Sequence, residues 1–332
     1  MKLIPKLARC LVAVAGFVAT CGAQACMNDY VPNVEAINRS HSLVEQLTHH
    51  PVAEPWTARR DRLRKALAEG GDFRVKNDLA TALAHTGEAA EAVRLLEEIE
   101  AEKPGLYATA ANLGTAYELS GDNEKALQWI REGIVRNADS HERSEWLHVM
   151  ILQAKLAIAQ DPKWLESHSV LQWDGRPAPD KHLDPALVAN SISGNRGEKL
   201  SVEQVKAALI YQLHERLQFV QAPDVVVGAL LLDLGDMIGA EKSGQGGARG
   251  VFQLASQYLA TLPDHHPLAD RAWLGALSAG MAQSRPRSGV VESLTNPHAW
   301  QAMAPIVAVG LVAGLGIIAI KRRVESRRAK RV

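Results

Sequence analysis

Two consecutive stretches of the chain, residues 73–106 and 107–140, share one pattern of apolar and polar positions at a spacing of 34 residues. Large apolar side chains recur three or four positions apart, which is the period of one face of an α-helix. The matched positions are held by the pairs Leu79 and Leu113, Ala80 and Gly114, Leu83 and Tyr117, Gly87 and Gly121, Ala92 and Ala126, and Leu96 and Ile130. The pattern predicts two helices per stretch, with a glycine ending the first and a small residue where the second crosses it.

These matched positions resemble the tetratricopeptide repeat (TPR), a family of helical hairpins. The resemblance covers residues 73–162, with a degenerate third unit from His141 in which Lys155 stands where the turn glycine is expected. It implies an all-α fold, a TPR-like α-solenoid in which each hairpin buries its apolar face against the next. It also implies a protein-interaction module rather than an enzyme.

The chain on both sides of the repeats also has helical patterns. The segment 26–72 contains one amphipathic stretch and predicts an N-terminal helical cap region. Residues 163–200 are richer in Pro, Gly and Asn and show no period, which predicts a loop or linker. In the segment 201–283, Ser201 and Gln204 form a capping-box pattern before a series of apolar-periodic helices. We expect degenerate TPR-like hairpins there, and whether they include a true fourth repeat stays open.

The first residues have the pattern of a signal peptide. Basic residues precede an apolar run from Cys10 to Thr20, and a small-x-small pattern ends at Ala25. This predicts a signal peptide over residues 1–25. The apolar run would form a helix of only about 16 Å against a hydrocarbon core of about 30 Å. Two alternatives stay open, namely lipidation at Cys26 or Cys21 and an uncleaved anchor.

The other end of the chain predicts a transmembrane helix. Trp300–Ile320 would span about 31 Å as a helix and is apolar without a charge from Met303 onward, and a basic tail, 321–332, follows directly. A stalk over 284–299 precedes it, and a buried core helix is the alternative reading. The positive-inside rule places the tail in the cytoplasm. The expected location is therefore the bacterial inner membrane, single-pass, with the repeat domain periplasmic.

Charge and motifs exclude several classes of function. Lys and Arg together number 37, as do Asp and Glu, and the basic residues concentrate at the two ends, so the body is acidic. An acidic body argues against nucleic-acid binding, because phosphate contacts need clustered Lys and Arg. The histidine pairs, His49 with His50 and His265 with His266, lack the three or four convergent ligands that zinc needs. We expect no metal, no cofactor and no enzyme, since catalytic serine and zinc-protease motifs are also missing.

The resemblance implies that the first helix of each hairpin lines a concave wall that can bind peptides. The candidate peptide-binding residues are Arg74, Asn77, Thr81, His85, Asn112, Thr115 and Glu118. Asparagine is suited to this role because its amide offers both a donor and an acceptor to a peptide backbone. The expected function is a membrane-anchored interaction module that binds a protein or peptide of the cell envelope. A self-associating scaffold or assembly factor is the alternative, since the spacing of Gly310 and Gly314 permits close helix packing in a homo-oligomer.

Overall fold

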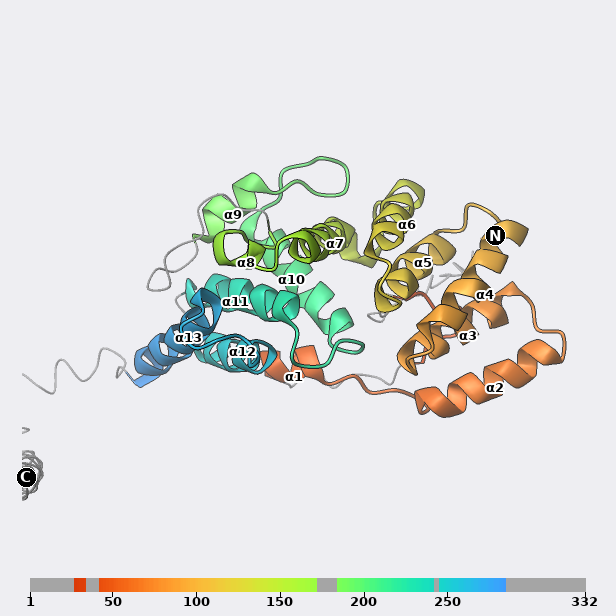
Figure 1. The fold of residues 1–332 in the computed structure, drawn as a ribbon, viewed down its shortest axis with the longest axis horizontal. Helices are drawn as coiled ribbons and strands as arrows, with labels where there is room; N and C mark the ends of the chain where they lie inside the picture. The colour runs from red at the N-terminus through yellow and green to blue at the C-terminus, as the bar shows by residue number, and fades with distance from the viewer. Residues whose placement is uncertain (1–26, 34–41, 172–183, 242–244, 285–332) are drawn as a thin grey trace, which may run out of the picture. The chain divides into compact units, whose positions relative to one another are not determined.

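The computed structural model describes residues 27–33, 42–171, 184–241 and 245–284 (Figure 1). The regular secondary structure within these residues is helical, apart from one isolated β-bridge between Ser193 and Lys199. The α-helices are α1 (Leu43–Thr48), α2 (Trp56–Ala68), α3 (Phe73–His85), α4 (Ala89–Glu102), α5 (Tyr107–Leu119), α6 (Asn123–Arg136), α7 (Glu145–Gln160), α8 (Trp164–Ser167), α9 (Pro185–Ser191), α10 (Val202–Arg216), α11 (Val225–Gly239), α12 (Gln245–Tyr258) and α13 (Pro267–Ser284).

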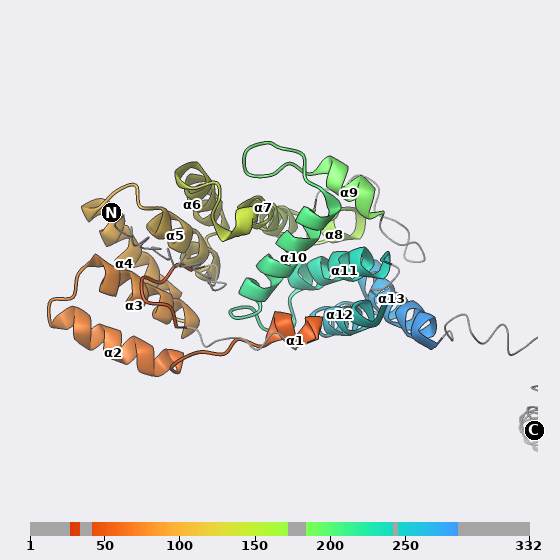
Figure 2. The ribbon, with the colours of Figure 1, turned by 180° about the vertical axis from the view of Figure 1, so that it is seen from behind.

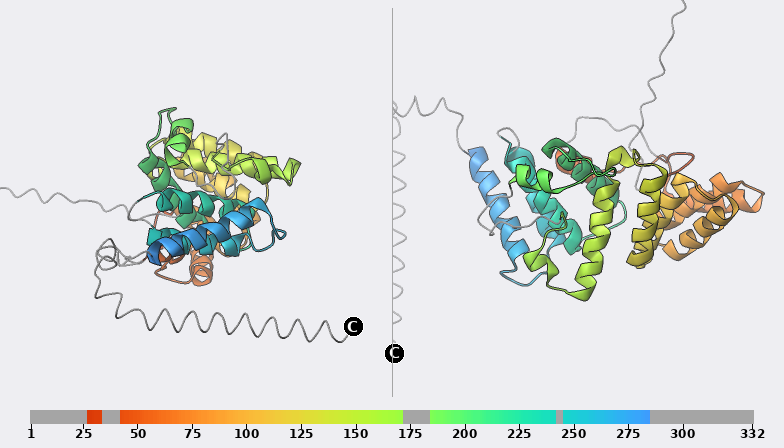
Figure 3. Two further views of the ribbon diagram at one scale, coloured as in Figure 1. Left: turned by 90° about the vertical axis from the view of Figure 1, so that its left-hand side faces the viewer. Right: turned by 90° about the horizontal axis from the view of Figure 1, so that it is seen from above.

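Helices α2 to α7 pack each against the next along the chain, and the hairpins lie side by side (Figure 3). Gly87 and Gly121 follow α3 and α5 with φ of +83° and +91°, a left-handed conformation that glycine adopts without a steric penalty. Asp72 and Asp122 cap α3 and α6 by accepting backbone N–H bonds. This sequential packing confirms the predicted all-α, TPR-like arrangement of helix pairs.

Gly114 is the point of closest approach between α5 and α6. A Cβ at this position would lie 2.3 Å from Cδ1 of the buried Ile130. We therefore expect Gly114→Ala to lose about 1 kcal/mol of unfolding free energy, because overpacking costs about 1–3 kcal/mol and better helix propensity returns about 1. Gly133→Ala on α6 is the control, since its Cβ would meet nothing closer than 3.7 Å. Urea unfolding should show that Gly133→Ala leaves the free energy of unfolding unchanged or raises it. If Gly114→Ala has the same unfolding free energy as Gly133→Ala, the expectation is wrong.

The repeats have one apolar core, and the C-terminal helices contribute to a second one. Ser201 caps α10 in the predicted capping box, in which its side chain accepts from the backbone N–H of Gln204. The glycine-rich stretch before residue 251 is partly helical, since α12 begins at Gln245. Within the predicted linker 163–200 the chain forms the short helices α8 and α9, and Leu165 and Val188 are buried in this second core.

Helix α1 packs against other helices than α2, although only seven residues of chain, 49–55, separate the two. It packs against α10 and α12, and its Leu47 is fully buried in the second core (Figure 2). Residues 43–68 therefore link the two halves of the body. On α13, Arg271 donates to Asp236 and Asp233 of α11, which ties α13 to the same core.

The predicted signal peptide (1–25), transmembrane helix (300–320) and basic tail (321–332) lie outside the described residues, as does nearly all of the predicted stalk. None of the helices in the described ranges is both apolar and long enough to cross a bilayer.

Candidate peptide-binding groove

The wall of the groove comes from the inner faces of α3 and α5. Asn77 on α3 and Asn112 on α5 lie one position apart in the 34-residue pattern, in which Asn112 is the equivalent of Asp78, and both asparagine side chains are fully buried. The Nδ2 of Asn112 donates to Oδ1 of Asn77 over 2.9 Å, so the two amides form a continuous polar strip across the hairpins. The structure thus brings together the two asparagines that the sequence singled out.

A segment of the same chain, Met27–Val31, lies along this strip. The backbone N–H of Asn28 donates to Oδ1 of Asn112 over 2.6 Å, and Nδ2 of Asn112 donates back to the carbonyl of Asn28 over 3.1 Å. The Nδ2 of Asn77 donates to the same carbonyl over 2.6 Å. One side-chain amide therefore satisfies both backbone groups of a single residue, as a neighbouring β-strand would.

Asp78, next to Asn77 on α3, extends the backbone contacts by two residues. Its two carboxylate oxygens accept the backbone N–H groups of Tyr30 and Val31, over 2.7 and 2.9 Å. Arg59 of α2 donates to the carbonyl of Val31 and lies 3.6 Å from the Asp78 carboxylate. Every one of these contacts to Tyr30 and Val31 is with the backbone, so their side chains play no part in them.

Three side chains of the segment meet distinct surroundings. Met27 is 1% exposed and belongs to the apolar core of the repeats. The buried carboxylate of Asp29 faces Arg59 at 3.2 Å. The Tyr30 ring stands edge-on to Phe73 with centroids 5.5 Å apart, and the guanidinium of Arg74 lies 5.8 Å from its centroid. Arg74 is otherwise exposed and paired with Asp72 at its own helix start.

The Asp29 carboxyl has a raised pKa. Burial raises the pKa to about 7, with Arg59 opposing the rise and the Asp78 charge adding to it. A carboxyl whose pKa is raised in the folded state binds protons more readily there than in the unfolded chain. The stability it contributes is therefore greatest below about pH 4 and falls as the pH rises towards 7.

Among the remaining candidates, Thr81 lies close enough to the segment for its hydroxyl to lower the pKa of Asp29. Thr81 and Thr115 donate to carbonyls one turn back in their own helices. His85 is stacked between Trp56 and Phe219, with ring centroids 3.6 and 4.2 Å away. Glu118 points towards the C-terminal helices. The peptide-binding role of the seven candidates stays a prediction.

Glu118 is the centre of a buried charge cluster that joins the repeats to α7 and α10. Its carboxylate accepts from His148 Nε2 at 2.8 Å, from Lys155 Nζ at 2.6 Å and from the guanidinium of Arg216. Burial alone would raise the pKa of Glu118, but Arg216, Lys155 and His148 hold it well below the ordinary value. Likewise, burial alone would lower the pKa of His148, but its hydrogen bonds to Glu118 and Glu145 raise it.

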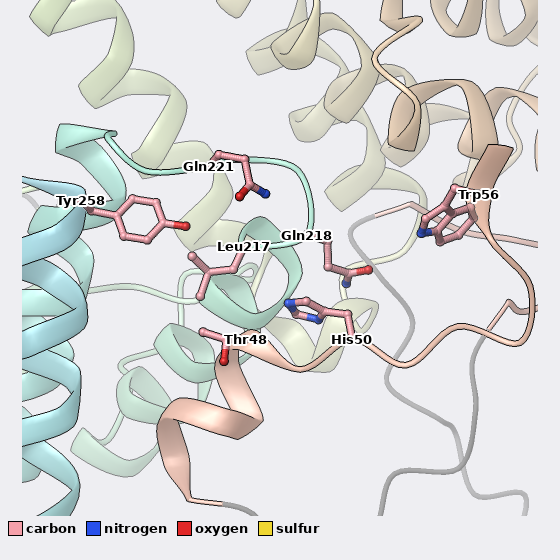
Figure 4. Close-up of a pocket in the computed structure, with 7 residues that line it drawn as sticks. All are labelled: Thr48, His50, Trp56, Leu217, Gln218, Gln221 and Tyr258. Atoms are coloured by element: carbon pink, nitrogen blue, oxygen red, sulfur yellow. The ribbon is translucent and has the colours of Figure 1, made fainter.

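A separate pocket of about 310 Å³ lies near His85 and shares Trp56 with its stack (Figure 4). It is lined by Thr48, His50, Trp56, Leu217, Gln218, Gln221 and Tyr258. His50 also stands 4.5 Å from His214 of α10, centroid to centroid. No group of three or more His, Cys, Asp or Glu side chains within the described part of the chain converges in a way that would hold a metal ion.

Sequence reasoning missed the segment Met27–Val31, Arg59 and the part that Asp78 plays. No periodic signal marks residues 27–31, and nothing in their composition points to a partner 84 residues away, the separation of Asn28 and Asn112. A chemical signal was available for Asp78, since a carboxylate next to the wall asparagine is well placed to accept backbone N–H groups.

Comparison with known proteins supports the presence of TPR-like repeats in part of the chain. No family model matches the chain. It is 39% identical over 77 residues to the TPR repeat-containing protein YvcD of Bacillus subtilis (strain 168), a match that spans 23% of this chain and 16% of that protein. The similarity is thus distant and partial. Together with the packing of α2 to α7, it supports a TPR-like arrangement of helix pairs. TPR repeat-containing proteins are usually non-catalytic scaffolds.

Proposed function

We propose that the protein is a membrane-anchored interaction module whose groove binds a peptide or protein partner in the cell envelope. The observation that carries this proposal is the double hydrogen bond between the Asn112 amide and the backbone of Asn28. It gives the wall a means of holding a peptide backbone of any sequence, as strand addition does at a sheet edge. The groove therefore has the chemistry of a peptide receptor, and no reaction is needed to account for it.

The anchoring part of the proposal depends on the two ends of the sequence. A signal peptide over residues 1–25 would export the body, and Trp300–Ile320 with its basic tail would hold it at the inner membrane. Tethering raises the effective concentration of the groove for other proteins at the same membrane. Protease added to spheroplasts should cleave the body, while a reporter fused after Val332 should be protected. The opposite result would rule out this topology.

Crosslinking in intact cells tests the groove itself. We expect a partner to be captured by the wild-type chain and at least tenfold less by Asn112→Ala, because that change removes both backbone hydrogen bonds at once. Asn190→Ala on the exposed side of α9 is the matched control and should capture as much as wild type. A partner whose yield is the same with all three chains would bind elsewhere, and the proposed role of the groove would be wrong.

A further inference from the structure

We propose that Met27–Val31 is an intramolecular ligand that closes the groove, and that the external partner is a peptide of similar chemistry that displaces it. This inference depends on the proposed function and adds to it a closed state and a description of the partner. It follows from the way the segment is held, from the side chains that fit, from the exposure of Tyr30 and Val31 and from the raised pKa of Asp29.

The wall recognises the backbone of the segment at three residues. Asn112 and Asn77 hold the N–H and carbonyl of Asn28, and Asp78 holds the N–H groups of Tyr30 and Val31. These contacts require free N–H groups and a chain that bends at Tyr30 and Val31, so that two consecutive N–H groups reach one carboxylate, and they do not depend on side chains. A partner peptide can therefore make the same hydrogen bonds, provided that no proline occupies the position of Asn28, Tyr30 or Val31.

The surroundings of the segment define which side chains a partner should carry. The position of Met27 opens into the apolar core of the repeats, which favours a large apolar residue. Two residues later, Arg59 faces a short side chain with oxygen acceptors, as Asp29 shows. The next position lies against Phe73 and Arg74, which favours an aromatic ring. We therefore expect an apolar residue, then Asp or Asn two positions on, followed directly by an aromatic residue.

Several features make the segment displaceable rather than a fixed part of the core. It belongs to no helix or strand, and its last two residues are exposed, Tyr30 at 37% and Val31 at 64%. The raised pKa of Asp29 shows that docking its carboxylate near neutral pH has a cost. A tethered ligand acts at an effective concentration on the order of 1 mM. If the segment itself has an intrinsic Kd of about 10–100 µM, the groove is about 10–100-fold more often closed than open. A competing peptide would then bind the wild-type chain about 10–100-fold more weakly than a chain with an open groove.

Peptide binding to the full chain tests the closed state. The probe is a fluorescein-labelled synthetic peptide with the sequence of residues 27–33, and binding is followed by anisotropy. Met27→Glu places a charge in the apolar core, and Asn28→Pro removes the N–H that Asn112 accepts, so each should release the segment without altering the wall. We expect both variants to bind the probe 10–100-fold more tightly than wild type. Pro32→Ala, at an exposed neighbouring position, should bind like wild type.

The outcomes separate this inference from the proposed function. If Met27→Glu and Asn28→Pro bind the probe more tightly than wild type, and adding Asn112→Ala abolishes this gain, both the closed state and the peptide-binding groove are supported. Wild-type binding as tight as that of the folded variants would overturn the closed state and leave the peptide-binding groove standing. If neither folded variant binds the probe, the inference fails, and crosslinking in cells still decides the proposed function on its own.

Hydrogen exchange tests the same point without any substitution. A displaceable segment must open locally, so the amides of Asn28, Tyr30 and Val31 should exchange at least 100-fold faster than those in the middle of α3 and α5. If the three amides exchange only with global unfolding, the segment is a permanent part of the repeat core. That result would overturn the inference even if the variants failed to fold.

Discussion

Replacing Glu118 by alanine is expected to lower the free energy of unfolding by about 3–5 kcal/mol, because the change leaves buried cations without their carboxylate. Glu118 is fully enclosed at the junction of α5, α7 and α10, and it accepts from His148, Lys155 and Arg216. Lys155 can turn partly to solvent, but Arg216 and His148 cannot, since both are almost completely buried. Urea unfolding followed by circular dichroism measures the loss.

Two further variants show whether charge is the cause. The double change Glu118→Leu with Arg216→Met should recover part of the loss, because it removes both buried charges together. Arg196→Ala breaks an exposed ion pair, in which Arg196 donates to Asp139 over 2.7 Å, and should cost less than about 1 kcal/mol. If Glu118→Ala costs no more than Arg196→Ala, the cluster does not hold the two halves together.

The cluster also has a predicted dependence on pH. The pKa of Glu118 is held well below its ordinary value, so its contribution is present above about pH 4.5 and is lost on acidification. The pKa of His148 is raised, so its contribution is present below about pH 6.5 and is lost as the pH rises through its folded value. The stability that these two groups provide is therefore greatest between about pH 4.5 and 6.5.

The parts of the fold that the sequence predicts are those held by contacts close in the chain. The repeated apolar positions of residues 73–140 predict α3 to α6, because each helix packs on its immediate neighbour. The glycines at the helix ends and the capping box at Ser201 are likewise local signals. Asn77 and Asn112 became candidates only through the resemblance, since periodicity alone does not tell which face of a hairpin lines a groove.

The contacts that set the groove and the junction join distant segments that share no pattern. Asn28 and Asn112 are 84 residues apart, and Glu118 and Arg216 are 98 residues apart. The packing of α1 on α12 is of the same kind. Such pairings depend on the path of the whole chain, so a charged residue such as Arg216 looks from the sequence like any solvated arginine at a helix end.

His85, one of the candidate wall residues, instead forms a buried aromatic stack that should make the protein sensitive to acid. Its ring lies between Trp56 and Phe219, and its Nε2 has no hydrogen-bond partner among the described residues. Burial, together with the nearby charges of His50 and Arg59, lowers its pKa to about 3. His50 behaves similarly, since burial and the proximity of His214 and His49 lower its pKa to about 4.

The sign of the effect follows from linkage. A histidine with a lowered pKa stays neutral in the folded protein while it takes up a proton in the unfolded chain, so stability falls as the pH drops below about 6.5. For a folded pKa of about 3, His85 alone should remove about 2–3 kcal/mol between pH 7 and pH 4.5, at about 1.4 kcal/mol for each pH unit below 6.5. The loss should appear as a lower urea midpoint at pH 4.5.

Replacing His85 by phenylalanine should abolish this part of the acid sensitivity, because the new ring keeps the stack with Trp56 and Phe219 and cannot be protonated. Between pH 7 and pH 4.5, we expect the unfolding free energy of His85→Phe to fall by about 2–3 kcal/mol less than that of wild type. His168→Phe is the matched control, since His168 also stacks on a tryptophan, Trp164, but is exposed. If His85→Phe and wild type lose the same stability on acidification, the neutral buried imidazole is not the cause.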